Sequence, residues 1–136
     1  MLSQIIFKKF RIIFYITLVM IFCFGSQAGA DKKNDINATI KAAEQGDAAA
    51  QCNLGFMYDN GKGVPQDYKK ALYWHTKSAE QGEALAQYNL GIMYDNGEGV
   101  PQNYVIAYAW WNLSSANGDK DANKNRDILR REMTSQ

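Results

Sequence analysis

Two side chains have the chemistry expected of a catalytic centre, a thiol and an imidazole. Cys52 is the only cysteine after residue 30, and His75 is the only histidine in the chain. A cysteine becomes a nucleophile when a base such as histidine lies within hydrogen-bond reach of it. His75 stands close to lysines such as Lys77, which is typical of a solvated helix face, and no further residues converge on the pair. The sequence therefore predicts that the protein is not an enzyme and that His75 lies at the surface.

The chain also lacks the patterns that hold metal ions and phosphates. A zinc site needs about four Cys, His or carboxylate ligands at defined spacings, and the sequence does not supply them. Asp59, Asn60 and Gly61 resemble the start of a calcium loop, but its alternating oxygens and closing glutamate are missing. No serine or threonine follows the lysine at 62, as a phosphate-binding loop requires. We expect turns here, with neither a metal nor a cofactor.

The first thirty residues have the composition of a secretory signal peptide. Three basic residues precede an apolar run over 12–24, and an A-x-A pattern ends at Ala30. The run is much shorter than the ~20 residues that a membrane-spanning helix needs. We predict cleavage after Ala30, export to the periplasm or the outside of a bacterial cell, and no stable membrane span afterwards. An uncleaved membrane anchor is the alternative.

The charge of the remaining chain argues against a nucleic-acid partner. Residues 1–30 contain three basic and no acidic residues, so their removal changes the formal charge from +1 to 1 − 3 = −2. Nucleic-acid-binding domains carry a basic stripe. With a single cysteine left, an internal disulfide is impossible, and the fold must be held by packing.

A repeat of 36 residues dominates the rest of the sequence. The segment 44–79 aligns with 80–115 without gaps, and 22 of the 36 aligned positions are identical. The longest shared segment, Met57–Gly61, returns as Met93–Gly97. A fixed period of this length is typical of proteins built from stacked units, none of which can bury its apolar face alone.

Each repeat is predicted to form a helix, a loop and a second helix. Residues 48–58 are rich in helix formers and contain no proline, and Gly61 then ends the helix. Asp67, and Asn103 in the second copy, can cap the helix over 68–79 and its counterpart. Because two helices joined by a short loop form an antiparallel pair, the predicted fold is all-α: an α-solenoid of antiparallel helix pairs.

Positions that are identical in both copies are predicted to be structural. They recur at spacings of three or four, which places them on one face of each helix. The predicted core, which also takes in Met57, Ser78 and Ser114, consists of Ala50, Leu54, Tyr58, Tyr68, Ala71, Trp74, Ala86, Leu90, Tyr94, Tyr104, Ala107 and Trp110.

Positions that differ between the copies define the candidate binding site. Residues 49, 52 and 56 share one face of the first helix, as do 85, 88 and 92. First helices line the groove in solenoids of this class, so a variable apolar stripe there suits a protein or peptide partner. The alternative is that this face packs against flanking helices. With two asparagines that can bond a peptide backbone, the predicted groove consists of Ala49, Cys52, Asn53, Phe56, Leu85, Tyr88, Asn89 and Ile92.

The repeats are expected at 47–82 and 83–118, between a leading segment (31–46) with a short helix and a C-terminal capping helix (119–136). The second helix of the second repeat is apolar on nearly all sides, which indicates burial on more than one side. The capping helix can cover part of it. A homodimer through the same surface is the alternative.

The shared segment resembles the Sel-one-like repeat, a relative of the tetratricopeptide repeat. The likeness covers about residues 42–118, and it is carried by Leu54-Gly55, Met57-Tyr58, Asn60-Gly61, Gly63-Val64-Pro65-Gln66, Tyr68, Ala71 and Trp74. The resemblance implies an α-solenoid whose members act as scaffolds in protein complexes. Many bacterial members are exported.

One cysteine-rich branch of that family is associated with penicillin binding or weak β-lactamase activity. In that branch a cysteine pair bridges the two helices of each repeat, whereas Cys52 has no partner here and its counterpart is Tyr88. This activity is the alternative function that the resemblance implies, and a protein- or peptide-binding scaffold is the preferred one.

Overall fold

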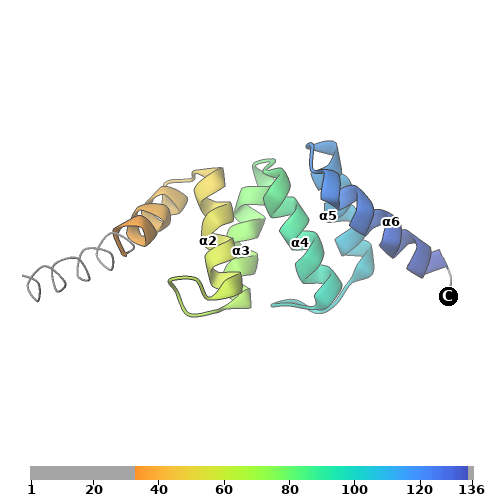
Figure 1. Ribbon diagram of the computed structural model, residues 1–136, viewed down its shortest axis with the longest axis horizontal. Coiled ribbons are helices and arrows are strands. Elements are labelled where there is room, and N and C mark those ends of the chain that lie inside the picture. Colours follow the sequence, from red (N-terminus) through yellow and green to blue (C-terminus); the bar gives the residue numbers. More distant parts are fainter. Residues whose placement is uncertain (1–32, 135–136) are drawn as a thin grey trace, which may run out of the picture. The chain divides into compact units, whose positions relative to one another are not determined.

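The computed structural model describes residues 33–134, which are helical and loop segments without a strand. Residues 33–44 are helical, and the helices that follow (Figure 1) are α2 (Ala48–Asn60), α3 (Tyr68–Glu80), α4 (Ala84–Asn96), α5 (Tyr104–Ala116) and α6 (Lys120–Thr134). The chain divides into a unit of residues 1–36 and a unit of residues 37–136, and the packing described here lies within the second. The predicted signal peptide lies outside the described residues.

The helices form two antiparallel pairs, α2 with α3 and α4 with α5. The Ser78 hydroxyl near the end of α3 donates a 2.7 Å hydrogen bond to the Ala48 carbonyl at the start of α2. Ser114 donates the equivalent bond to the Ala84 carbonyl, also at 2.7 Å. A bond from the end of one helix to the start of its partner requires opposite directions. Because α4 also packs on α3 and α6 on α5, the pairs stack into the predicted α-solenoid.

The helix ends are set by capping residues that the sequence indicates. The side-chain oxygens of Asp67 and Asn103 accept backbone N–H groups of the first turns of α3 and α5 at 3.1 Å. Gly61 and Gly97 follow α2 and α4 with φ of 64° and 74°, a left-handed conformation that glycine adopts without strain. The predicted caps are confirmed.

The two first helices differ in their caps, which provides a stability test. Asp47 accepts the Ala50 amide at 2.7 Å, whereas Glu83, at the same position before α4, makes no capping bond. We expect Glu83→Asp to raise the free energy of unfolding by about 0.5–1.5 kcal/mol, because the shorter side chain reaches the amide. The matched control, Asp47→Glu, should lower it by a similar amount in urea denaturation. Unchanged stability in both variants would contradict this account.

The core of each repeat contains a close contact between a glycine of the first helix and a ring of the second. A Cβ on Gly55 would lie 2.7–2.9 Å from atoms of the His75 imidazole, and a Cβ on Gly91 would overlap the Trp111 indole. The two rings are 0% and 3% exposed. Glycine therefore stands inside both helices despite its low helix propensity, because any other side chain would displace the ring.

The prediction that His75 lies at the solvated surface is wrong. Its ring is fully buried against Gly55, and neither ring nitrogen has a hydrogen-bond partner among residues 33–134. Trp111 fills the same position in the second repeat, where its Nε1–H donates to the Tyr88 carbonyl at 3.2 Å. Comparison of the two copies did not identify this position as part of the core, because its residue differs between them. Its spacing of four from Ala71 nevertheless places it on the core face of the helix.

The predicted core residues separate into three groups. The six small or aliphatic ones are buried: Ala50, Leu54, Ala71, Ala86, Leu90 and Ala107. The half-buried aromatics Tyr58, Trp74, Tyr94 and Trp110 pack against the buried clusters. Tyr68 and Tyr104 are 37% and 42% exposed, so their assignment to the core is wrong. They are the first residues of α3 and α5 and follow exposed loop residues, where little of the stack remains to cover them.

Buried glutamines tie each first helix to the helix before it. The Gln51 side-chain amide donates to the Ala43 carbonyl at 3.1 Å, and the Gln87 amide donates to the Ala79 carbonyl at 3.0 Å. Each of these carbonyls also accepts the N–H of a glycine in the turn that follows, from Gly46 at 3.1 Å and from Gly82 at 3.0 Å, so the glutamine amide is a second donor to it. The leading helix is thereby joined to the first repeat, as the sequence predicts.

α6 has the register of a third first helix, and its side chains close the stack. Ala122 and Leu129 are buried at positions that buried residues of α4 also fill. Asp127 stands where α2 and α4 have the ring-contacting glycine, and its carboxylate lies 3.2 Å from Arg126 and 3.7 Å from Arg130. Charged groups on this face favour water over a further packed helix, so α6 acts as the predicted cap.

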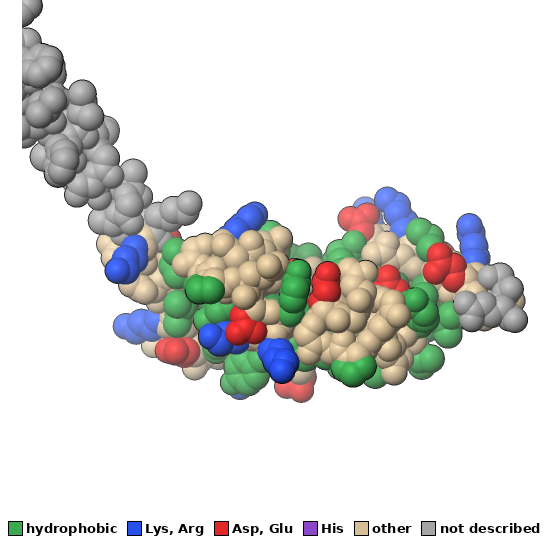
Figure 2. Space-filling view, turned by 90° about the horizontal axis from the view of Figure 1, so that it is seen from below, with side chains coloured by type: hydrophobic (Ala, Val, Ile, Leu, Met, Phe, Trp, Pro, Cys, Tyr) green, Lys and Arg blue, Asp and Glu red, His purple; other side chains and the backbone are tan. Residues whose placement is uncertain are grey.

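α5 is covered by α6 on one side only. Its side chains Val105, Ile106 and Leu113 remain exposed. Seen from the side of the two long loops (Figure 2), hydrophobic side chains lie in separate groups among charged ones. The homodimer through α5 stays a prediction.

Candidate functional site

The first helices present an exposed row of side chains that recurs with the 36-residue period. Because spacings of three and four place residues on one side of a helix, each helix contributes a short stripe. We call this row the first-helix face, and it consists of Ala49, Asn53 and Phe56 of α2, Leu85, Asn89 and Ile92 of α4, and Asn125 and Ile128 of α6. Phe56, Leu85 and Ile128 are 43%, 51% and 53% exposed, so large apolar side chains stand in water along it.

The first-helix face differs from the predicted groove at positions 52 and 88. Cys52 is 4% exposed and packs with Ala86 and Leu90 of α4, so its assignment to the groove is wrong. Tyr88 is half-buried and packs on the cluster that contains Leu129 of α6. Cys52 packs on α4, whereas Tyr88 packs on α6. Because the two helices present different side chains, the two repeats have different residues at this position. The alternative interpretation, packing against flanking helices, holds for this position.

The structure brings the other six predicted groove residues onto one side of the stack. Ala49, Asn53, Phe56 and Leu85 are exposed, and Asn89 and Ile92 are partly exposed. The side-chain amides of Asn53 and Asn89 make no hydrogen bond to other described residues. Their donors and acceptors are therefore available to a ligand. The Lys62 ammonium lies 4.7 Å from the centre of the Phe56 ring. Amides beside exposed apolar groups suit contact with a polypeptide.

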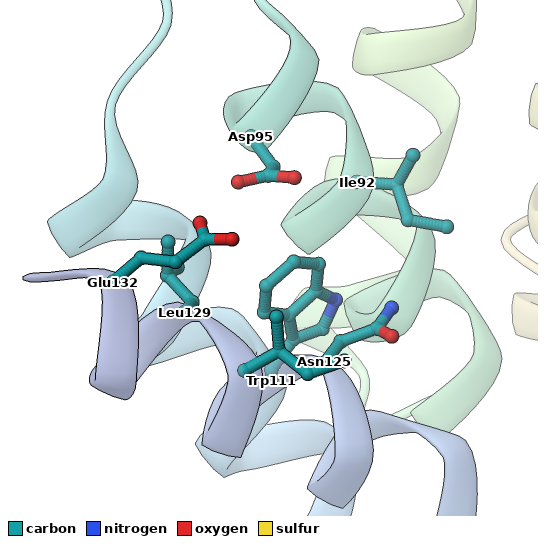
Figure 3. A pocket seen from close by; sticks show the side chains of 7 residues that line it. Ile92, Asp95, Trp111, Asn125, Leu129 and Glu132 are labelled. Atoms are coloured by element: carbon teal, nitrogen blue, oxygen red, sulfur yellow. The ribbon is translucent and has the colours of Figure 1, made fainter.

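At its α6 end the first-helix face deepens into a pocket of about 300 Å³ (Figure 3). The buried Trp111 of α5 forms its floor. Its walls come from α4 and α6 and consist of Ile92, Asp95, Asn125, Ile128, Leu129 and Glu132. The carboxylates of Asp95 and Glu132 face the same space in Figure 3. The pocket therefore combines an apolar base with an acidic rim.

The polar side chains of the pocket interact with one another and with neighbouring residues. Burial raises the pKa of Asp95, and the negative charge of Glu132 raises it further. The Asn125 amide donates to the Tyr88 hydroxyl at 3.2 Å, which leaves its carbonyl oxygen as an acceptor. The indole N–H of Trp111 is already bonded to a backbone carbonyl. The Asn125 carbonyl oxygen and the Asp95 carboxylate are therefore hydrogen-bond acceptors in the lining of the pocket.

Cys52 and His75 do not form a catalytic pair. Neither nitrogen of His75 has a hydrogen-bond partner in the part of the chain that the structure describes. Burial, with a smaller effect from the charge of Glu83, raises the pKa of the Cys52 thiol to about 11. Burial lowers the pKa of His75 to about 4. At neutral pH the thiol stays protonated, and it is the thiolate that acts as a nucleophile. Between residues 33 and 134, no three His, Cys, Asp or Glu side chains are placed to hold a metal ion.

The sequence reasoning missed the pocket and its residues Asp95, Trp111, Asn125 and Glu132. The sequence nevertheless contains a pattern that indicates part of this site. Extending the 36-residue period beyond residue 118 aligns Asn125 with Asn89 and Asn53, and Ile128 with Ile92 and Phe56.

Comparison with protein families matches the Sel1 repeat to residues 48–83 and 84–119. A crystal structure of a Sel1 repeat protein from Oxalobacter formigenes is similar, with 36% sequence identity and a TM-score of 0.66 over 68% of this chain and 70% of that one. Comparison with curated proteins gives no match.

Two further solved structures share the fold. One is c5321, a protective antigen present in uropathogenic Escherichia coli strains, with 40% identity and a TM-score of 0.71 over 74% of this chain and 22% of that chain. The other is the Helicobacter pylori cysteine rich protein B, with 27% identity and a TM-score of 0.62 over 65% of this chain and 67% of that chain. Among the described helices, none has the length and apolarity needed to cross a membrane.

Proposed function

Because the chain belongs to the Sel1-repeat family, whose members are typically scaffolds for protein interaction, we propose that it binds an extended segment of a partner protein along the first-helix face. The observation that carries this proposal is the row of Asn53, Asn89 and Asn125 at a constant spacing of 36 residues, beside the equally spaced Phe56, Ile92 and Ile128. An extended peptide repeats its backbone groups at regular intervals, and a regular row of amides can bond them.

The energetics favour recognition through a few apolar anchors. Phe56, Leu85 and Ile128 each expose about half of their surface, and covering apolar surface contributes about 25 cal/mol per Å². Amide hydrogen bonds contribute less to net affinity, since each replaces a bond to water, but they set the register and direction of the bound segment. We therefore assign affinity mainly to the apolar side chains and orientation to Asn53 and Asn89.

The β-lactamase alternative has no supporting observation at Cys52. That thiol is buried between α2 and α4, and its raised pKa keeps it protonated. A scaffold function needs no nucleophile with a lowered pKa. In a scaffold, the buried Cys52 side chain simply contributes to the packing between α2 and α4.

The test is to map the contacts of a partner in cells. A photoreactive amino acid placed at position 56 or 85 should cross-link one partner protein, whereas the same group at position 73 on α3 should not. Phe56→Ala should then weaken binding of that partner about tenfold or more, the range of an interface anchor. Tyr73→Ala is the matched control, because Tyr73 is also an exposed aromatic, at 53%. Equal losses in both variants, or cross-links from position 73 alone, would place the binding surface elsewhere.

We also propose that the protein is exported after cleavage of residues 1–30. The support is the basic start, apolar run and A-x-A pattern of that segment. A scaffold of this kind would then meet its partner in the periplasm or outside the cell. The mass of the protein recovered from that compartment should correspond to a chain that begins at Asp31.

A further inference from the structure

The outward side of α5 is exposed and entirely apolar. Its members recur at spacings of three and four, which place residues on one side of a helix. All of them are exposed: Val105, Ile106, Ala109, Leu113 and Ala116. Val105 and Leu113 are 66% and 47% exposed. α5 contains no charged residue, and none of these five side chains can form a hydrogen bond.

The same positions of α3, one repeat earlier, are mostly charged. The residues that stand 36 positions before these five are Lys69, Lys70, Tyr73, Lys77 and Glu80, and they are exposed as well. Lys70 lies 3.8 Å from Asp67. Lys69 and Lys77 have no carboxylate within ion-pair distance in the part of the chain that the structure describes. At least two ammonium groups on this side of α3 are therefore not paired with an acid.

The outward sides of α3 and α5 lie next to each other in the stack. Both helices pack on α4, and the loop before α5 touches the first turn of α3. A Cβ on Gly99 would lie 2.6 Å from the Tyr68 carbonyl oxygen and 3.2 Å from the Lys69 amide nitrogen. We call the combined surface of these ten residues the second-helix face. It is aliphatic over α5 and basic over α3, where three lysines stand against one glutamate.

This composition is complementary to an anionic membrane surface. Proteins that bind such surfaces place aliphatic side chains among the acyl chains and lysines among the phosphate headgroups. Acyl chains need no hydrogen bond, and the second-helix face offers none over α5, whereas a protein interface forms about one hydrogen bond per 100–200 Å². Tyr73, which is 53% exposed beside Lys77, is of a type enriched at the membrane–water boundary.

We propose that the second-helix face docks on an anionic membrane surface, with Val105, Ile106 and Leu113 among the lipids and the lysines of α3 at the lipid phosphates. The proposal does not depend on the proposed function, because it uses α3 and α5. The first-helix face lies on α2, α4 and α6, so docking leaves it to the partner protein.

The test measures binding to vesicles of phosphatidylglycerol and phosphatidylcholine in equal parts. The protein recovered from the cell, with its first residue established by mass, should float with these vesicles and much less with pure phosphatidylcholine. Added salt should release it. Leu113→Gln should weaken binding about tenfold, the range for one exposed aliphatic side chain. Leu85→Gln is the matched control, because Leu85 is 51% exposed on the first-helix face, and it should keep the binding.

The lysines of α3 provide a second arm of the test. Lys69→Gln combined with Lys77→Gln should weaken binding about tenfold or more, because each lysine near an anionic surface contributes about fivefold. Lys62→Gln, which changes an exposed lysine beside the first-helix face, should have little effect. A photoreactive amino acid at position 113 should cross-link phospholipid, and one at position 85 should not. This comparison remains valid for a chain that retains residues 1–30.

Helical circular dichroism establishes that each variant is folded. The proposal would be overturned by a protein that does not float with the anionic vesicles, by equal effects of Leu85→Gln and Leu113→Gln, or by equal lipid cross-links from positions 85 and 113. A dimer that Leu113→Gln dissociates, and that binds no vesicles, would assign the face to a second copy of the chain instead. The protein cross-links from positions 56 and 85 report separately on the proposed function.

Discussion

Replacing Gly91 with alanine is expected to lower the free energy of unfolding by about 1–3 kcal/mol, although alanine is the better helix former. The gain in helix propensity is about 1 kcal/mol. Against it, the new Cβ would overlap the Trp111 indole, with 2.7 Å to Cε2 and closer approaches to Nε1 and Cδ1. Overpacking of this kind costs about 1–3 kcal/mol, and displacing the ring also breaks its bond to the Tyr88 carbonyl. Urea denaturation followed by circular dichroism measures the net effect.

If the clash with Trp111 causes the loss of stability, removing the indole should reverse the sign of the effect of Gly91→Ala on the free energy of unfolding. In a Trp111→Ala background the obstacle is gone, and Gly91→Ala should then stabilise the protein through helix propensity alone. The pair Gly55 and His75 supplies a matched cycle in the first repeat, with 2.7–2.9 Å between the new Cβ and the imidazole. If Gly91→Ala destabilises equally with and without the indole, the contact is not the reason for the glycine.

Acidification is expected to remove about 3 kcal/mol of stability through His75 alone. Its pKa is about 4 in the folded protein, because burial disfavours the charged ring, and 6.5 is its ordinary value. The neutral form is thus favoured by folding. This contribution is fully present above pH 6.5, declines as the pH falls below 6.5, and is lost once the pH is below about 4. Each pKa unit of difference corresponds to about 1.4 kcal/mol.

The variant His75→Trp, which copies the second repeat, should not show this loss between pH 6.5 and pH 4. The difference between the two proteins is the informative quantity, because other groups also titrate. Burial raises the pKa of Asp59 and Asp95, so their protonation favours the folded state and acts in the opposite direction. Denaturation at several pH values gives both curves. Parallel pH dependence in the wild type and the variant would mean that His75 is solvated in the folded protein.

The burial of His75 also illustrates where sequence comparison fails. Identity between repeats marks positions where both copies meet the same neighbour, such as Ala71 and Ala107, or Ser78 and Ser114. It overlooks core positions where the two neighbourhoods differ in size, such as His75 and Trp111, and it mistakes some of them for a binding surface, as at Cys52. Tyr68 and Tyr104 show the converse: both copies repeat an aromatic that stays exposed.

The sequence by itself determined the helical repeat, its period, its caps and its stacking, because these follow from local rules of spacing, helix ends and buried apolar faces. Only the tertiary structure decided which side of each first helix stays in water. Residues 52 and 53 are one step of about 100° apart on a helix of 3.6 residues per turn, and the way the helices pack buries the first and exposes the second. It also brought Asp95, Trp111 and Glu132 around one pocket. These residues lie on three helices, and their distances depend on how the helices pack rather than on any pattern along the chain.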